Sequence, residues 1–68
     1  MREVGIRDDM IRLGQLLKLA GAVDSGGDVK SVLGAGVVSV NGEVETRRGR
    51  QLHKGDVVAL NGEQVRVV

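Results

Sequence analysis

The residues best suited to chemistry in this sequence form a basic run, Arg47-Arg48-Gly49-Arg50, with Lys54 close behind it. Clustered arginine and lysine side chains suit the binding of phosphate groups, although a solvated surface loop has the same composition. The run follows a predicted tight hairpin, so we expect it to be held by structure rather than to lie in a flexible tail. Three further cations can add a second basic row if the fold brings them to the same side: Arg12, Lys18 and Lys30.

A second candidate is the predicted start of a helix at Ser25-Gly26-Gly27. The first backbone N–H groups of a helix have no partner within it, and the helix dipole favours an anion at that end. Glycine lets a phosphate approach the backbone closely, and Lys30 adds charge one turn further on. An ordinary capped helix start has the same residues, and the spacing is not that of a Walker phosphate-binding loop. We therefore include Ser25 and Gly26 among the candidate contacts.

The composition excludes several classes of site. There is no cysteine and His53 is the only histidine, so disulfides and a zinc site of the usual ligand types are not expected. There is no aromatic residue, which excludes the stacking of bases on aromatic rings. The carboxylates are scattered at predicted caps and turns, and no nucleophile lies at a telling distance from a base. We expect no catalysis, no metal and no cofactor.

Charge and length place the chain more broadly. Ten basic residues against nine acidic ones give a net charge of +1, so any electropositive surface must be local. Sixty-eight residues make one domain, near the lower size limit for folding alone. The N-terminus lacks an apolar run, so we expect no signal peptide and no membrane span, and a cytoplasmic protein.

The basic residues of the first half lie on a predicted helix–turn–helix–strand motif over residues 10–42. The first helix is expected at Met10–Ala20, capped by Asp8 or Asp9 and ended by Gly21, with one apolar stripe: Leu13, Leu16, Leu17 and Ala20. Gly14 lies inside this helix, and the sequence leaves open a close approach of another segment or, as we favour, simple sequence drift.

The second helix is expected at Gly26–Ala35, with Ser25 and Asp28 at a capping-box spacing and Gly36 at its end. Three glycines make it weak by propensity, so it must be stabilised by packing of its apolar residues, Val29, Val32 and Leu33.

The remaining residues predict strands. Asn41-Gly42 and Asn61-Gly62 predict two hairpins with type I′ turns, over residues 37–45 and 57–68. Lys54-Gly55-Asp56 predicts a turn into the last hairpin. Residues 1–9 are expected to be a short strand or a tail, and residues 43–68 supply the remaining strands. The predicted fold is a single α+β domain with two short helices on one face of a small antiparallel sheet.

As a whole, residues 12–56 resemble the RNA-binding domain named after small-subunit ribosomal protein four, the S-four domain. The resemblance lies in Arg-Leu-x-x-Leu-Leu at residues 12–17, in Gly-x-Val-x-Val-Asn-Gly at residues 36–42, and in Lys-Gly-Asp at residues 54–56. The stretch VNGEVETRRGR is similar to the small free-standing YbcJ-like RNA-binding proteins of bacteria.

The resemblance implies non-catalytic binding of structured RNA, ribosomal or transfer RNA among the candidates, by a ribosome-associated monomer. It implies that Arg12 is the first-helix arginine, that Ser25 and Gly26 begin the second helix, and that Lys30 is its inner basic residue. Gln15 stands where a basic residue is common, and Gly26-Gly27 replaces a more basic helix start. The implied RNA contacts are Arg12, Lys18, Ser25, Gly26, Lys30, Arg47, Arg48, Arg50 and Lys54.

The alternative is a protein-interaction module that uses a ubiquitin-like surface or a sheet edge at Val65–Val68. Ubiquitin-like sulfur carriers share the VNGE hairpin but need a C-terminal Gly-Gly, and this chain ends in Val67-Val68.

Overall fold

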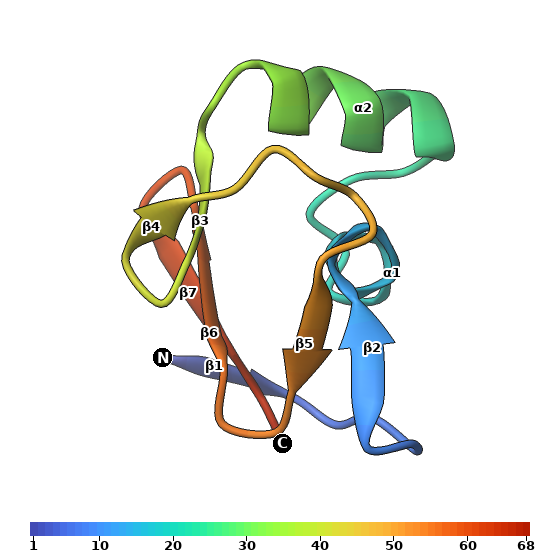
Figure 1. Cartoon of the computed structure of the whole chain (residues 1–68), viewed down its shortest axis with the longest axis vertical. Helices are drawn as coiled ribbons and strands as arrows, with labels where there is room; N and C mark the ends of the chain where they lie inside the picture. The colour runs from blue at the N-terminus through green and yellow to red at the C-terminus, as the bar shows by residue number, and fades with distance from the viewer.

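The computed structural model describes all of residues 1–68 and confirms the α+β fold class (Figure 1). It contains two helices, α1 (Leu13–Leu19) and α2 (Gly26–Gly34), and seven short strands. The strands are β1 (Arg2–Val4), β2 (Met10–Arg12), β3 (Val38–Val40), β4 (Glu43–Val44), β5 (Gln51–His53), β6 (Val57–Leu60) and β7 (Glu63–Val67). Both helices are too short to span a bilayer.

The main sheet has five strands in the order β1-β7-β6-β3-β4. It is mixed rather than antiparallel, because β1 pairs in parallel with β7 while the other pairs are antiparallel. Residues 1–9, predicted as a strand or a tail, therefore contain a paired strand. The prediction of a free edge at Val65–Val68 is wrong, because β1 and β6 cover both sides of β7, and the edges of the sheet are β1 and β4.

The first helix begins later than predicted. Met10–Arg12 form β2, which pairs antiparallel with β5 and places Ile11 opposite Leu52. The cross-strand partner, which lies some forty positions away in the sequence, outweighs the local helical pattern. Asp8 and Asp9 consequently precede a strand and do not cap α1. Arg12 occupies the N-cap position instead, and its backbone N–H donates to Gln15 Oε1 at 3.2 Å.

Both Asn-Gly turns form as predicted, with positive φ at Asn41 (52°) and Gly42 (88°) and at the equivalent pair in the β6–β7 hairpin. The first turn is also tied to the Lys54–Asp56 turn. Asn41 Nδ2 donates to Asp56 Oδ1 at 3.1 Å, and the backbone N–H of His53 donates to Asp56 Oδ2 at 2.7 Å. These bonds fix the end of β5 against the hairpin.

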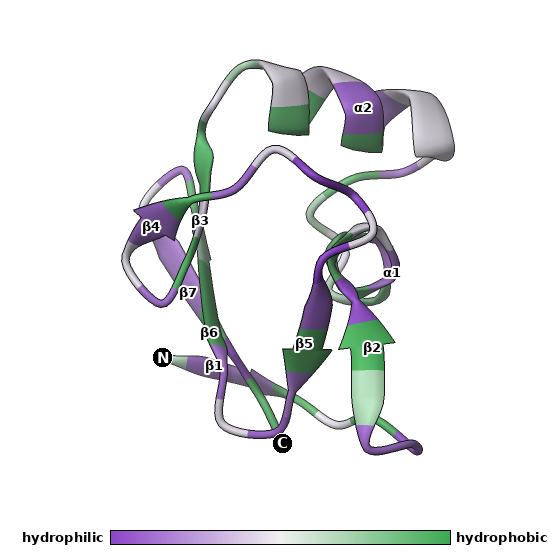
Figure 2. Ribbon diagram, viewed as in Figure 1, coloured by the Kyte–Doolittle hydropathy of each residue, from purple (hydrophilic) through white to green (hydrophobic).

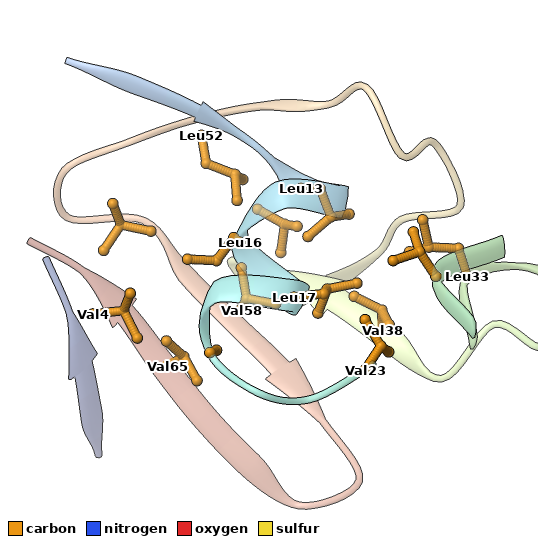
Figure 3. Packing of buried hydrophobic residues seen from close by; sticks show 14 residues of the cluster. Val4, Leu13, Leu16, Leu17, Val23, Leu33, Val38, Leu52, Val58 and Val65 are labelled. Atoms are coloured by element: carbon orange, nitrogen blue, oxygen red, sulfur yellow. The ribbon is translucent and has the colours of Figure 1, made fainter. Parts of the chain in front are cut away.

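The core lies between α1, α2 and one face of the main sheet (Figure 3). The predicted stripe of α1 is buried throughout, and Val29 and Leu33 of α2 join it, whereas Val32 is only half-buried. Leu52 of β5 is fully buried, so the small β2–β5 ladder packs on the same core. In Figure 2 the segment between β4 and β5 is largely hydrophilic, and it crosses the molecule between the sheet and α1.

Candidate nucleic-acid interface

The basic loop, residues 47–50, is attached to the first turn of α1 by backbone hydrogen bonds. The N–H groups of Leu13 and Gly14 donate to the carbonyl oxygens of Arg50 and Arg48, each at 2.9 Å. Arg12 Nη1 also donates to the carbonyl oxygen of Gly49 at 2.9 Å. The loop carbonyls thus satisfy the first two helix donors, which would otherwise be available to an anion. This frame fixes the position of the loop against the helix.

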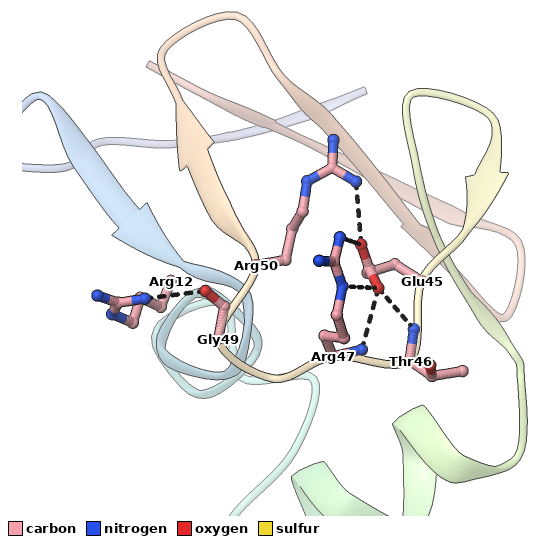
Figure 4. Close-up of polar contacts among 6 residues, drawn as sticks. All are labelled: Arg12, Glu45, Thr46, Arg47, Gly49 and Arg50. Atoms are coloured by element: carbon pink, nitrogen blue, oxygen red, sulfur yellow. Dashed lines mark hydrogen bonds and ion pairs between the residues drawn. The ribbon is translucent and has the colours of Figure 1, made fainter.

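Glu45 organises the basic loop from the other side (Figure 4). Its side chain is only 8% exposed, and its Oε2 accepts hydrogen bonds from the backbone N–H groups of Thr46 and Arg47, both at 3.0 Å. The same carboxylate accepts from Arg47 Nε at 3.1 Å, from Arg47 Nη2 at 3.0 Å and from Arg50 Nη1 at 3.0 Å. The side-chain bond from Arg47, followed by its backbone N–H and by Arg50, holds the pKa of Glu45 far below its usual range.

These contacts divide the three loop arginines into two groups. Arg47 and Arg50 form the only two ion pairs of the molecule, both with Glu45. The side chain of Arg47 is nevertheless 74% exposed, whereas that of Arg50 is 33% exposed. Arg48 is exposed and has no ion-pair partner. The charge of Arg48 is therefore fully available to a ligand, and the charges of Arg47 and Arg50 are partly offset.

Arg48 meets two cations from the first half of the chain. The cationic hollow is a shallow depression lined by Arg12, Gly14, Gln15, Lys18, Arg48 and Gly49. Neither Arg12 nor Lys18 forms an ion pair, and both are exposed. No carboxylate and no apolar side chain line this hollow. The predicted meeting of basic residues from both halves of the chain therefore occurs for these three side chains.

A second polar hollow lies on the other side of Gly49, lined by Arg47, Gly49, Arg50, Gln51, His53 and Asp56. It contains a carboxylate, and the backbone N–H of His53, followed by the Asn41 amide, holds the pKa of Asp56 below its usual range. Because Asp56 stays ionised here and Glu45 pairs with both arginines, this hollow carries less free positive charge than the cationic hollow.

Three predicted contacts lie at the start of α2, outside both hollows. Ser25 caps α2, with its Oγ accepting from the backbone N–H of Asp28 at 3.4 Å. Gly26 begins the helix, and Lys30 is exposed one turn further on. No hydrogen bond or shared hollow connects these residues to the basic loop.

Lys54 is also separated from the basic loop. It lies in the turn after β5, whereas the loop precedes that strand (Figure 1). The three residues of β5 separate Lys54 from Arg50, and Lys54 lines neither of the two hollows described above. Lys54 therefore shares no hollow with the loop arginines, although its neighbours His53 and Asp56 line one with Arg47 and Arg50.

Sequence reasoning missed three residues of this site. At Gly14 the loop and α2 pack against the helix, but an added Cβ would make ordinary van der Waals contacts, at 3.4 Å to Val29 Cγ1 and 3.5 Å to Arg48 Cβ, so the space does not require glycine. Gln15 lines the cationic hollow although it is uncharged. Glu45 was grouped with the scattered carboxylates, and the available signal was an acidic residue two positions before a run of arginines.

Comparison with known proteins gives a consistent family. The family model described as the S4 domain matches residues 4–68. The chain is 49% identical over 59 residues to "Probable ribosome maturation protein RlbA" of Bacillus subtilis (strain 168), covering 87% of this chain and 83% of that protein. It is 40% identical over 58 residues to "Putative RNA-binding protein YbcJ" of Escherichia coli (strain K12), covering 85% and 83% respectively.

A solved structure supports the same assignment. The crystal structure of 30S ribosomal protein S4e from Thermoplasma acidophilum matches with a TM-score of 0.69 and 27% sequence identity. The match covers 91% of this chain but only 33% of S4e, so the chain corresponds to about a third of that protein. The chain belongs to the S4 domain family.

Proposed function

We propose that this protein binds structured RNA, with Arg12, Lys18 and Arg48 contacting phosphates in the cationic hollow. The observation that carries the proposal is the meeting of three exposed, unpaired cations from α1 and the basic loop around a hollow without a carboxylate. Backbone hydrogen bonds fix the loop to the helix, so the backbone positions that carry the three charges are set before any ligand arrives. A polyanion binds such a surface by displacing counterions.

The other predicted contacts have different roles in this proposal. Arg47 contributes its exposed guanidinium at the rim, and Arg50 mainly supports the loop through Glu45. Ser25 and Gly26 form the helix start, while Lys30 and Lys54 lie outside the contact surface. The protein acts as a binding module and not as an enzyme.

The relatives favour ribosomal RNA as the partner. One relative is named as a probable ribosome maturation protein, another as a putative RNA-binding protein, and the structural match is a 30S ribosomal protein. A protein with such a partner works in the cytoplasm. We take one chain per RNA site, because the cationic hollow is complete within a single chain.

The test is a binding titration against folded ribosomal RNA stem-loops at several salt concentrations. Three phosphate contacts predict a slope of log K against log salt of about −2 to −3, at roughly −0.7 to −0.9 per contact. Arg48→Ala should reduce that slope by about one contact and weaken binding about tenfold at low salt. The matched control is Arg66→Ala, which removes the same charge from an exposed position on β7.

Equal effects of Arg48→Ala and Arg66→Ala would contradict a local site and indicate a response to net charge alone. Binding that does not change with salt would contradict phosphate recognition. A partner captured from cells and retained after ribonuclease treatment, together with no binding to the stem-loops, would replace the proposal with protein interaction.

A further inference from the structure

A third hollow adjoins the cationic hollow and differs from it in being partly apolar. Half of its lining is apolar and comes from two neighbouring segments: Ile6, Met10, Ile11 and Leu19. The other half is Gly5, Arg7, Asp8 and Gln15. We call it the apolar hollow. In Figure 2 the Met10–Ile11 part of β2 is hydrophobic, and the strand becomes hydrophilic at Arg12, where α1 begins. The change from apolar to basic therefore takes place over adjacent residues.

Leu19 is the unusual residue of this hollow. The other leucines of α1, at positions 13, 16 and 17, are buried in the core, whereas Leu19 is 56% exposed. The remaining exposed large apolar residues, Met1, Val37, Val44 and Val68, line none of the five hollows of the molecule. Ile6, Met10 and Ile11 are half-buried, and Ile6 and Ile11 also pack against the core, so Leu19 adds its exposed surface to a partly covered apolar patch. Apolar surface gathered in a hollow is typical of a binding site, whereas single exposed apolar residues are ordinary.

Gln15 joins the two hollows. It lines both the cationic hollow and the apolar hollow, and it lies one turn before Leu19 on the same face of α1. Its Oε1 accepts from the backbone N–H of Arg12, which fixes the side chain and leaves its Nε2 group as a donor. The cationic and apolar surfaces thus adjoin along the whole length of α1, with Gln15 in both.

We propose that the apolar hollow receives an unpaired nucleobase of an RNA whose phosphates occupy the cationic hollow. This inference rests on the function proposed above and adds a preference for RNA with a bulged or looped-out nucleotide. The chain has no aromatic side chain, so an extruded base must find its apolar contact on aliphatic surface. Arg7 and Gln15 supply donors and Asp8 supplies an acceptor for a base edge, since all three line the hollow.

A nucleobase fits these observations better than a protein side chain. The three cations beside the hollow have no ion pair, and a polyanion neutralises them as it places a base next to them. An apolar protein segment would fill the hollow without using those charges. The occupant is therefore a nucleotide whose phosphate and base lie on either side of Gln15.

The experiment compares two RNA hairpins that share one loop and differ only in the stem. The stem of the paired hairpin is fully paired, and that of the bulged hairpin carries one bulged 2-aminopurine. The unmodified protein should bind the bulged hairpin about fivefold more tightly, as expected for apolar contact on one face of a base. The fluorescence of the 2-aminopurine should rise on binding, because the base leaves its neighbours in the stack. Leu19→Ser should reduce the preference to within twofold and leave the affinity for the paired hairpin unchanged.

The matched control is Val44→Ser, which removes an apolar side chain that is 67% exposed on β4 and lines none of the hollows. This variant should retain the fivefold preference, and thermal unfolding should confirm that both variants are folded. Equal binding of both hairpins by the unmodified protein would overturn this inference and leave RNA binding intact. A Leu19→Ser variant that keeps the fivefold preference for the bulged hairpin would also overturn this inference. A protein contact of Leu19 would not rescue it. Failure to bind either hairpin at low salt would instead contradict the proposed function itself.

Discussion

The two helix starts of this protein have similar sequence signals for phosphate binding but different surroundings. At the start of α1 the basic loop supplies carbonyl oxygens to the Leu13 and Gly14 N–H groups, and an exposed arginine lies beside the helix. At the start of α2 the cap comes from the helix's own Ser25, and Lys30 has no second cation from another segment in a shared hollow. The unpaired cations therefore lie together at the start of α1, where the first two backbone N–H groups already donate to the loop.

This difference indicates how a small domain with a net charge of only +1 can make a cationic surface. A helix start offers partial charge, which is strongest when its donors are free. Full charges from side chains do not need free donors, but they need a backbone that brings them together against their mutual repulsion. The hydrogen bonds between the loop and α1 hold the two backbone segments in that arrangement.

The largest expected effect separates the two helix starts directly. Replacing Arg12, Lys18 and Arg48 together by glutamine should weaken RNA binding at least a hundredfold near physiological salt and reduce the salt slope by about two to three, because three phosphate contacts are lost. Lys30→Gln, at the start of α2, should change affinity less than threefold. Titrations at four salt concentrations measure both values. A Lys30→Gln effect as large as that of any single replacement at the cationic hollow would remove the distinction between the two starts.

A smaller effect is expected at Glu45, which has no counterpart at the start of α2. Glu45→Ala removes the acceptor of two backbone N–H groups and two guanidinium groups. We expect a lower melting temperature and RNA binding weakened several-fold, because the loop loses its fixed conformation although the net charge rises. Circular dichroism melts and the same titration check this.

Glu63→Ala is the matched control for that variant, since it removes an exposed carboxylate of β7 that forms no ion pair. It should leave binding unchanged or slightly tighter. If Glu45→Ala instead tightened binding more than Glu63→Ala does, Glu45 would be a competitor of the RNA phosphates and not a support of the loop.

The local parts of this fold were predictable from the sequence because their causes are local. The Asn-Gly pairs need positive φ, and Gly21 and Gly36 follow their helices with φ of 74° and 73°. The apolar stripe of α1 follows from the spacing of its residues, so it was predictable without knowing which segments pack on it. The predicted start of the first helix, Met10, was wrong. Residues Met10–Arg12 form a strand because Gln51–His53 lies beside them, and the local sequence does not show that pairing.

The candidate site was predictable in composition but not in arrangement. Arg12 and Arg48 meet because of bonds between the loop carbonyls and α1, and backbone carbonyls leave no trace in residue types. Lys54 was grouped with the arginines by its position in the sequence, but it lines neither of the hollows that the arginines line. Glu45 was not singled out, since only the folded loop brings five donor groups to one carboxylate.

The stability of the protein at low pH should also distinguish the surroundings of the two helix starts. Both carboxylates with a depressed pKa, Glu45 and Asp56, lie in or near the basic loop that packs on α1. The folded-state pKa values of Glu45 and Asp56 lie below the unfolded values of about 4. Their contribution is therefore complete above about pH 5 and is lost as the pH falls through 4 and below. Urea denaturation at pH 7, 5 and 3.5 should show this decline, and Asp56→Asn should flatten it. If the unfolding free energy of the Asp56→Asn variant falls with pH as steeply as that of the unmodified protein, Asp56 does not contribute to the decline.

The smallest effect on binding is expected at Ser25, and it tests whether the start of α2 is purely structural. Ser25→Ala leaves the Asp28 N–H without its cap and should destabilise the protein by about 1 kcal/mol, toward the low end of the usual range because the bond is exposed and 3.4 Å long. RNA affinity and salt slope should stay within twofold of the unmodified values, because no shared hollow links this helix start to the cations. A tenfold loss of affinity with a reduced slope, in a protein that melts as expected, would mean that both helix starts contact phosphates.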